Sequence, residues 1–377
     1  MMLRFILALA ATFILAGTAV AAAPYPTTPV APAHAERWRI GYVESGDYEE
    51  YPLTLAEIIE GLEVLGWIQL PASPPDGLNG AELWKWVAQN VRSDWVEFVE
   101  DAYWSPGNFD SERRAPMRAA ISARLKEKAD IDLIIAMGTW AGQDLRELGP
   151  PIPTVVGSVS DAIASGISDS KDDSGRDNLH TRIEPERYER QLRLFHEIVG
   201  FDTLGIVYED SEAGRSYAAV GAAEQVAGEL GFRLVHCLAP SANIAHEVAV
   251  NNAVRCYAEL AEHHVDAVYV STHRGVTAQS LPQIAEVLLK GRVPSFSMAG
   301  SSEVRAGLLL SIAQADRSHV GLFHAETIAR IFNGARPRDL SQLWVDPPKI
   351  ALNLSTARRI GFDPPVDILL AADEVYE

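Results

Sequence analysis

The fold is indicated most clearly by the stretch IDLIIAMGT at residues 131–139. Its apolar run is interrupted only by Asp132 and has the length of a β-strand buried on both faces. Gly138 and Thr139 follow the run, and residues 141–148 can form a helix. A buried strand that continues through a glycine into a helix is typical of parallel α/β sheets.

The same alternation of short apolar runs and amphipathic stretches continues on both sides of this stretch. We expect strands at 39–43, 131–137, 152–156, 203–208, 232–237, 267–271, 293–298 and 308–312, and helices at 53–65, 185–199, 216–230, 244–263 and 280–290. Helices of this length connect parallel strands through right-handed crossovers. A polar loop at 168–178 separates two such sets, so the sequence predicts an α/β fold with two doubly wound parallel-sheet lobes.

The N-terminal residues predict export. Arg4 precedes an uncharged stretch at 5–17, and Ala19-Val20-Ala21 provides the small residues that a signal peptidase recognises. The stretch is shorter than the ~20 apolar residues that cross a bilayer. We therefore expect a signal peptide at 1–21 and a mature protein in the periplasm. Residues 22–36 are rich in proline and alanine and predict a mobile tether.

Charge and cysteine content narrow the classes of partner. A formal net charge of −19 repels nucleic acid and anionic lipid, so we expect a soluble monomer with no nucleic-acid partner. The two cysteines, Cys237 and Cys256, either form one disulfide in an oxidising compartment or are separate core residues. No cysteine–histidine cluster has metal-ligand spacing, so we expect neither a metal nor another cofactor.

Candidate ligand-binding residues follow several of the expected strands, because ligands of open parallel sheets bind beyond the carboxyl ends of the strands. These residues are Glu44, Ser45, Gly138, Thr139, Trp140, Ser158, Ser160, Asp161, Glu209, Ser211, Glu212, Ser271, Thr272, His273 and Arg274. Thr139 either binds a carboxylate or caps its own helix. Arg274 either pairs bidentately with a carboxylate or is a surface arginine.

The segment 76–110 is rich in tryptophan, and it predicts either a helical elaboration of lobe one or part of the cleft rim. Its tryptophans are Trp84, Trp86, Trp95 and Trp104. Signals for catalysis are poor, because the chain has no G-x-S-x-G elbow, no Walker loop and no G-x-G-x-x-G after the first strand. We therefore expect a protein that is not an enzyme.

Several segments resemble the ABC transporter substrate-binding family that includes tryptophan- and tyrosine-binding proteins and has a type 1 periplasmic-binding-protein fold. They are IDLIIAMGT at 131–139, IPTVVGSVSD at 152–161, LGIVYEDSE at 204–212, VPSFS at 293–297, FNGARP at 332–337 and LNLSTARRIG at 352–361. The resemblance covers about residues 39–377. The chain departs from the family at Asp161-Ala162, where an Asp-Pro pair is common. It departs again at His273 and Arg274, near a position where an acid would suit a ligand amine.

The resemblance implies three hinge crossings, with lobe one at 37–159 and 313–339 and lobe two at 160–312 and 340–377. It implies that a small molecule is captured in the cleft by hinge closure and passed to an ABC permease in the inner membrane. The ligand's identity stays open. Two alternatives also remain, a sensory binding protein partnered with a signalling receptor and a periplasmic enzyme on the same scaffold.

Overall fold

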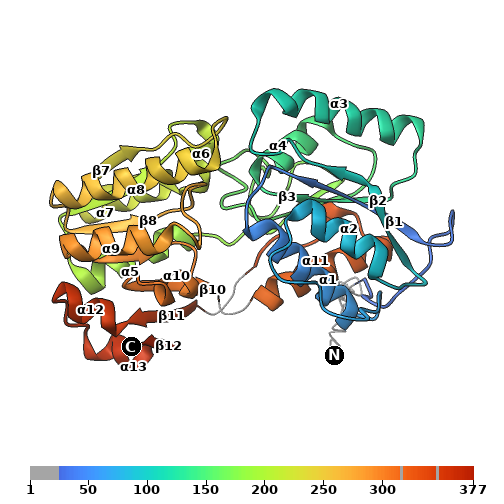
Figure 1. The fold of residues 1–377 in the computed structure, drawn as a ribbon. Helices are drawn as coiled ribbons and strands as arrows, with labels where there is room; N and C mark the ends of the chain where they lie inside the picture. The colour runs from blue at the N-terminus through green and yellow to red at the C-terminus, as the bar shows by residue number, and fades with distance from the viewer. Residues whose placement is uncertain (1–24, 315–316, 345–347) are drawn as a thin grey trace, which may run out of the picture.

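The computed structural model describes residues 25–314, 317–344 and 348–377, so the predicted signal peptide at 1–21 lies outside the described residues. The described chain forms two lobes side by side, each built on its own sheet (Figure 1). Among the described helices, none has the length and apolar character needed to span a membrane.

Lobe one contains a five-stranded parallel sheet. Its strands are β1 (Trp38–Glu44), β2 (Val96–Trp104), β3 (Leu133–Met137), β4 (Thr154–Gly157) and β5 (Leu179–Thr181), in the order β2-β1-β3-β4-β5. Its helices are α1 (Glu50–Val64), α2 (Gly80–Asn90), α3 (Ser111–Glu127), α4 (Thr139–Leu148) and α11 (Arg317–Phe332), with a 3-10 turn η1 (Pro337–Asp339). Every residue of β3 is buried, as the stretch IDLIIAMGT predicts.

Lobe two contains a seven-stranded mixed sheet. Its strands are β6 (Thr203–Tyr208), β7 (Arg233–Leu238), β8 (Ala267–Val270), β9 (Ser295–Ser297), β10 (Leu310–Gln314), β11 (Pro348–Asn353) and β12 (Glu374–Tyr376), in the order β12-β11-β10-β9-β8-β6-β7. Its helices are α5 (Arg187–Val199), α6 (Glu212–Tyr217), α7 (Val220–Leu230), α8 (His246–Glu262), α9 (Leu281–Gly291), α10 (Ser301–Arg305), α12 (Leu354–Ile360) and α13 (Val366–Ala371). The predicted fold class, two doubly wound lobes, is confirmed.

The chain passes between the lobes three times, after β5, after β10 and before β11. Between the second and third crossings α11 returns to lobe one and packs on α1 (Figure 1). Glycines allow this close approach. A Cβ on Gly61 would lie 2.8 Å from the Cβ of Ala325, and one on Gly321 would overlap the backbone of Glu57.

The first lobe boundary differs from the prediction. We expected lobe one to end at Val159, but β5 pairs in parallel with β4, so lobe one continues to Thr181. The third crossing also starts later than residue 340. Ile183 N donates to Gln342 O at 2.7 Å and Trp344 N donates to Ile183 O at 2.8 Å, so the first and third crossings run together.

Two secondary-structure predictions need correction. The single helix expected at 216–230 is divided into α6 and α7 at Ala219, whose φ of 53° is left-handed and cannot continue a helix. The strands β11 and β12 were not predicted, and β11 runs antiparallel to β10, so the sheet of lobe two is not wholly parallel.

The tryptophan-rich segment forms α2 and the edge strand β2 of lobe one. Trp84 is 1% exposed, stacks on Tyr42 with ring centroids 5.3 Å apart, and donates Nε1–H to Val99 O at 3.0 Å. The segment is therefore an elaboration of lobe one, with Trp84 in the core and the other three tryptophans partly buried against it. Its last residues also reach the cleft, where Phe109 lines the cavity.

The proline-rich segment contacts lobe one over its described part, which corrects the prediction of a mobile tether at 22–36. Trp67 Nε1 donates to Thr27 O at 2.7 Å, and Asn333 Nδ2 donates to Thr28 O at 3.0 Å. The segment offers backbone carbonyls, which proline leaves intact, to side-chain donors of the lobe. It therefore lies along the surface of lobe one.

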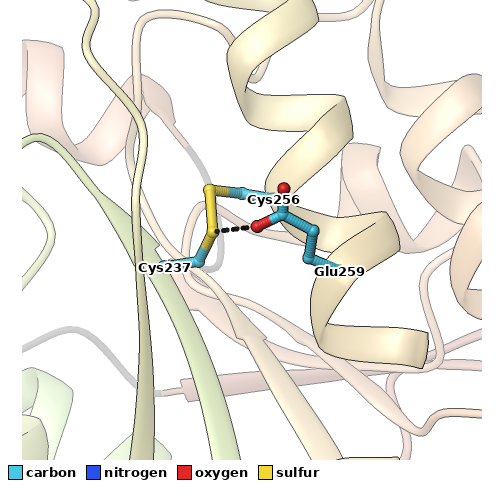
Figure 2. Close-up of side chains that lie close together, drawn as sticks. All are labelled: Cys237, Cys256 and Glu259. Atoms are coloured by element: carbon cyan, nitrogen blue, oxygen red, sulfur yellow. Dashed lines mark hydrogen bonds between the residues drawn. A yellow bond between two sulfur atoms is a disulfide. The ribbon is translucent and has the colours of Figure 1, made fainter. Parts of the chain in front are cut away.

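Cys237 and Cys256 form a disulfide that joins β7 to α8 (Figure 2). Their Cα atoms are 5.6 Å apart, within the range that a disulfide requires. The sequence left open whether the two cysteines form a disulfide or are separate core residues, and in the structure they form the disulfide. Glu259 Oε2 lies 3.5 Å from Cys237 Sγ, but disulfide sulfurs are not thiolates and offer a metal no ligand there.

Candidate ligand-binding cleft

A cavity of about 500 Å³ lies between the two lobes, within the size range of small-molecule pockets. Both lobes contribute residues that follow strands. They are Ser45 after β1, Thr139 after β3, Ser158 after β4, Glu209 after β6 and Thr272 after β8. The cavity is thus at the carboxyl ends of both sheets, where the strand-end rule places a ligand.

The turn between β3 and α4 shapes the wall of lobe one. Gly138 has φ 88° and ψ 174°, a conformation reserved for glycine, and a Cβ there would overlap the Tyr51 hydroxyl. Ser45 Oγ donates to Met137 O at 2.9 Å and accepts from Ala141 N at 3.0 Å. These bonds fix the first turn of α4, so that Thr139 lies at the cavity wall.

Aromatic side chains of lobe one also line the cavity. Phe109 and Trp140 meet edge to face with ring centroids 5.6 Å apart, and Tyr48 and Tyr51 do so at 5.2 Å. Edge-to-face pairs are a favourable aromatic arrangement that holds the rings in place. The wall therefore offers a ligand flat apolar surfaces with fixed positions.

The loop after β7 is held by Glu209. Glu209 Oε2 accepts from Ser241 N at 2.9 Å, from Ser241 Oγ at 2.5 Å and from Ala242 N at 2.6 Å, while Oε1 accepts from Ser211 Oγ at 3.0 Å. Burial alone would raise the pKa of Glu209, but the bonds to Ser241 and Ala242 outweigh it and lower the pKa. Glu209 is thus an ionised anchor for the loop at 239–244.

Arg274 is buried at the cavity wall, with 6% of its surface exposed. Its Nη1 donates to Ser241 O at 2.5 Å and to Ile244 O at 2.9 Å, whereas Nε and Nη2 are buried without a partner. Burial lowers the pKa of Arg274, and the charges of Asp47 and Glu209 partly oppose this shift. Even a lowered arginine pKa leaves the guanidinium charged.

The lobes touch at the edge of the cavity. Asn108 Nδ2 donates to Ile244 O at 3.0 Å, and Ser111 N donates to Asn243 Oδ1 at 2.9 Å. A further bond joins Ala278 N to Glu49 Oε1 at 3.2 Å. These contacts connect loops of the two sheets and form only when the lobes are together.

The sequence matches a family profile described as ABC transporter substrate-binding protein over residues 108–376. The chain belongs to this family. It is therefore a substrate-binding component of an ABC transporter, a class that binds small ligands and delivers them to a permease. The match favours transport over the sensory and enzymatic alternatives.

Solved structures share the fold at low sequence identity. A domain from Streptococcus pneumonia in complex with L-Trp is 19% identical, with a TM-score of 0.67, and covers 90% of this chain and 99% of its own. A conserved domain protein from Vibrio cholerae is 18% identical, with a TM-score of 0.65 and the same coverage, 90% and 99%. A substrate-binding protein with adhesive properties from Clostridium difficile, in a ligand-free open form, is 19% identical with a TM-score of 0.56, again covering 90% and 99%. None of the curated proteins matches the sequence.

Many of the predicted binding residues line the cavity of this substrate-binding protein. They are Ser45, Thr139, Trp140, Ser158, Ser160, Glu209, Thr272 and Arg274. Ser158 has φ 52°, a left-handed conformation that is uncommon for a residue other than glycine. Strained backbone of this kind is often found at binding sites, because the surrounding structure must hold it.

Three other predicted residues, Ser271, Ser211 and Gly138, lie behind the cavity wall and brace it, and a fourth lies outside the cavity. Ser271 Oγ donates to Val207 O at 2.6 Å, and Ser211 caps α6 by accepting from Gly214 N at 3.0 Å. Gly138 acts through its backbone conformation, and Glu212 is exposed outside the cavity lining.

Three more predicted residues are engaged elsewhere. Glu44 points away from the cavity and accepts from Tyr103 Oη at 2.5 Å. Asp161 closes its own turn by accepting from Ala164 N at 2.8 Å. His273 is fully buried; its Nδ1 accepts from Gly275 N at 2.9 Å, so Nε2 carries the proton donated to Ala239 O at 2.8 Å.

Sequence reasoning missed several lining residues, among them Tyr48, Phe109, Tyr188, Tyr217 and Ser241. Ser241 follows β7, so the strand-end rule could have found it. Phe109 and the tyrosines come from loops and helices, and no local pattern in the sequence indicates that they face the cavity.

Proposed function

We propose that this protein captures a small solute in the inter-lobe cavity within the periplasm and delivers it chemically unchanged to an inner-membrane permease. The observation that carries the proposal is the cavity of about 500 Å³, which both lobes line at the carboxyl ends of their strands. A ligand there contacts both lobes at once. Binding therefore favours the form in which the lobes are together, by shifting an open–closed equilibrium.

One carbonyl connects the cavity to the lobe–lobe contact. Ile244 O accepts from Arg274 Nη1 in lobe two and from Asn108 Nδ2 in lobe one. A ligand that orders Arg274 also orders the loop at 239–244, which carries this acceptor. Ligand binding and closure are thereby coupled through a short chain of hydrogen bonds.

The polar groups at the cavity favour binding over catalysis. Glu209 has both oxygens occupied by hydrogen-bond donors, and both ring nitrogens of His273 are engaged with backbone atoms. A general base needs a lone pair within reach of the group that it deprotonates. The lone pair of His273 Nδ1 is taken by Gly275 N, and Glu209 is held by three hydrogen bonds to Oε2 and one to Oε1, which supports delivery of an unchanged ligand.

The proposal is tested by screening solutes for a rise in melting temperature and following hits by small-angle X-ray scattering. Saturating ligand at 100 times its Kd adds about 2.7 kcal/mol of stability. We expect hits to reduce the radius of gyration and to be recovered intact by mass spectrometry. A ligand that is converted to product, or that binds without bringing the lobes together, contradicts the proposal. Light scattering tests the expected monomer.

A further inference from the structure

Arg274 lines the cavity, and one edge of its guanidinium has no hydrogen-bond partner. Nη1 is occupied by Ser241 O and Ile244 O, and Nε and Nη2 are buried without partners. In a planar guanidinium, Nε–H and the adjacent Nη2–H point in parallel along one side. Two parallel donors match the two oxygens of a carboxylate, in the bidentate geometry that arginine favours.

A buried cation without a counter-charge is costly, and a bound anion removes that cost. Within the described chain no acidic side chain forms an ion pair with Arg274 within 4.0 Å. Burial lowers its pKa, the charges of Asp47 and Glu209 raise it from a distance, and Glu209 holds the loop with both oxygens. An anionic ligand would supply the partner that Arg274 lacks.

An amino group beside the ligand's acid group is disfavoured. An ammonium on the neighbouring carbon would lie close to the guanidinium, where like charges repel. It would also need an acceptor, and Glu209 already accepts four hydrogen bonds, from Ser211, Ser241 and Ala242. Two further acids, Glu50 and Glu57, line the cavity, and both already interact with other groups of the protein. The site around Arg274 thus suits a simple acid better than an amino acid.

The body of the ligand faces aromatic rings. The Arg274 guanidinium carbon lies 5.7 Å from the ring centroid of Phe109, which belongs to the other lobe, and Phe109 packs against Trp140. A flat apolar group attached to the acid would lie along these rings, where stacking adds to hydrophobic burial. Tyr217 extends the same kind of surface on the side of lobe two.

We propose that the cleft ligand is an aromatic carboxylate without an adjacent amino group, held side-on by Nε and Nη2 of Arg274 with its ring against Phe109 and Trp140. The proposal rests on the proposed function, capture of a solute between the lobes. It adds the chemical class of the solute and the residue that selects it.

The test is calorimetric titration of the mature chain, freed of co-purified ligand, with matched probes. Benzoate, phenylacetate, 3-phenylpropionate and indole-3-acetate are each compared with the corresponding amide, and L-phenylalanine, L-tryptophan and phenyl phosphate are added. We expect at least one acid to bind at least 10-fold more tightly than its amide, its amino acid and the phosphate. Arg274→Gln should weaken that acid about 10- to 100-fold, the range for hydrogen bonds to a charged group.

Arg274→Lys keeps the positive charge but loses the two parallel donors. It serves as a second variant in case Arg274→Gln misfolds, and it should weaken binding of the acid at least 5-fold. Arg193→Gln, which removes a partly exposed arginine of α5 that pairs with Glu229 outside the cavity lining, should bind as wild type does. Equal binding of acid and amide, a preference for amino acid or phosphate, or wild-type affinity in folded Arg274→Gln and Arg274→Lys overturns the proposal. Closure on a sugar or nucleoside would overturn the ligand class and leave the proposed function standing, whereas a solute library that never closes the lobes overturns the proposed function.

Discussion

Removal of the Cys237–Cys256 disulfide should destabilise lobe two and loosen the ligand-binding loop together. The bridge closes a loop with a sequence separation of 19 residues. Inside that loop lie Ser241, which is held by Glu209, and Ile244, which accepts from Arg274. The bond therefore restrains the segment that connects the cavity with the contact between the lobes.

The magnitude follows from the size of the closed loop. For about 19 residues, the chain-entropy estimate of the stabilisation by a disulfide is about 3 kcal/mol at 25 °C. Cys256 is fully buried, and its replacement by alanine adds only the small cost of a lost sulfur atom. With a denaturant slope of about 3 kcal/mol/M, the urea midpoint of lobe two should fall by about 1 M.

The assay is equilibrium urea unfolding of wild type and of the double variant Cys237→Ala/Cys256→Ala, followed by circular dichroism. Dithiothreitol should lower the wild-type midpoint toward that of the variant and leave the variant unchanged, which controls for effects of the reductant. Hydrogen exchange at residues 239–244 should become faster in the variant. A midpoint shift below about 0.2 M, or unchanged exchange in this loop, would refute the reasoning.

Three further changes probe the site and the closure. Gly138→Ala should cost at least about 2 kcal/mol of unfolding free energy, because its φ is positive and a Cβ there overlaps neighbouring side chains. The control is Gly149→Ala at the end of α4, where φ is also positive but no atom is near, and it should cost about 1 kcal/mol; equal costs would contradict the prediction. Asn243→Ala removes the acceptor for Ser111 N and should lower the ratio of closed to open protein about 5-fold in small-angle scattering. Asn243→Asp keeps a side-chain oxygen as acceptor and is the control; identical scattering of wild type and Asn243→Ala would show that the bond contributes nothing. Burial raises the pKa of Glu44 to about 7, so the folded protein keeps a proton that the unfolded chain loses above pH 4.5, and the free energy of unfolding should fall by about 3 kcal/mol between pH 4.5 and 7. Glu44→Gln should remove that part of the decline, and pH profiles of stability that run parallel in the variant and the wild type would disprove it.

The lobes could be predicted because buried strands and amphipathic helices have distinct periodicities in the sequence. The stretch at 131–139 became β3 and the start of α4 as expected. The three-residue strand β5 was missed because it is too short to show alternation and follows a polar loop. Because β5 was not predicted, we placed the end of lobe one at Val159 instead of Thr181.

The strand-end rule located the cavity but could not choose among neighbouring side chains. Glu44 and Ser45 are adjacent in the chain, yet Ser45 lines the cavity and Glu44 faces Tyr103, because successive side chains at a strand end point in opposite directions. Phe109 could not be predicted at all. It reaches the cavity from the loop after β2, and only the packed fold brings it opposite Arg274.

The account is tested most directly by a crystal structure of the protein with its tightest-binding aromatic carboxylate. We predict the ligand between the lobes, with its two carboxylate oxygens about 2.7–2.9 Å from Nε and Nη2 of Arg274. We also predict that the bond from Asn108 Nδ2 to Ile244 O is present in the complex. A ligand bound outside the inter-lobe cavity, or inside it with its acid group away from Arg274, would contradict the account.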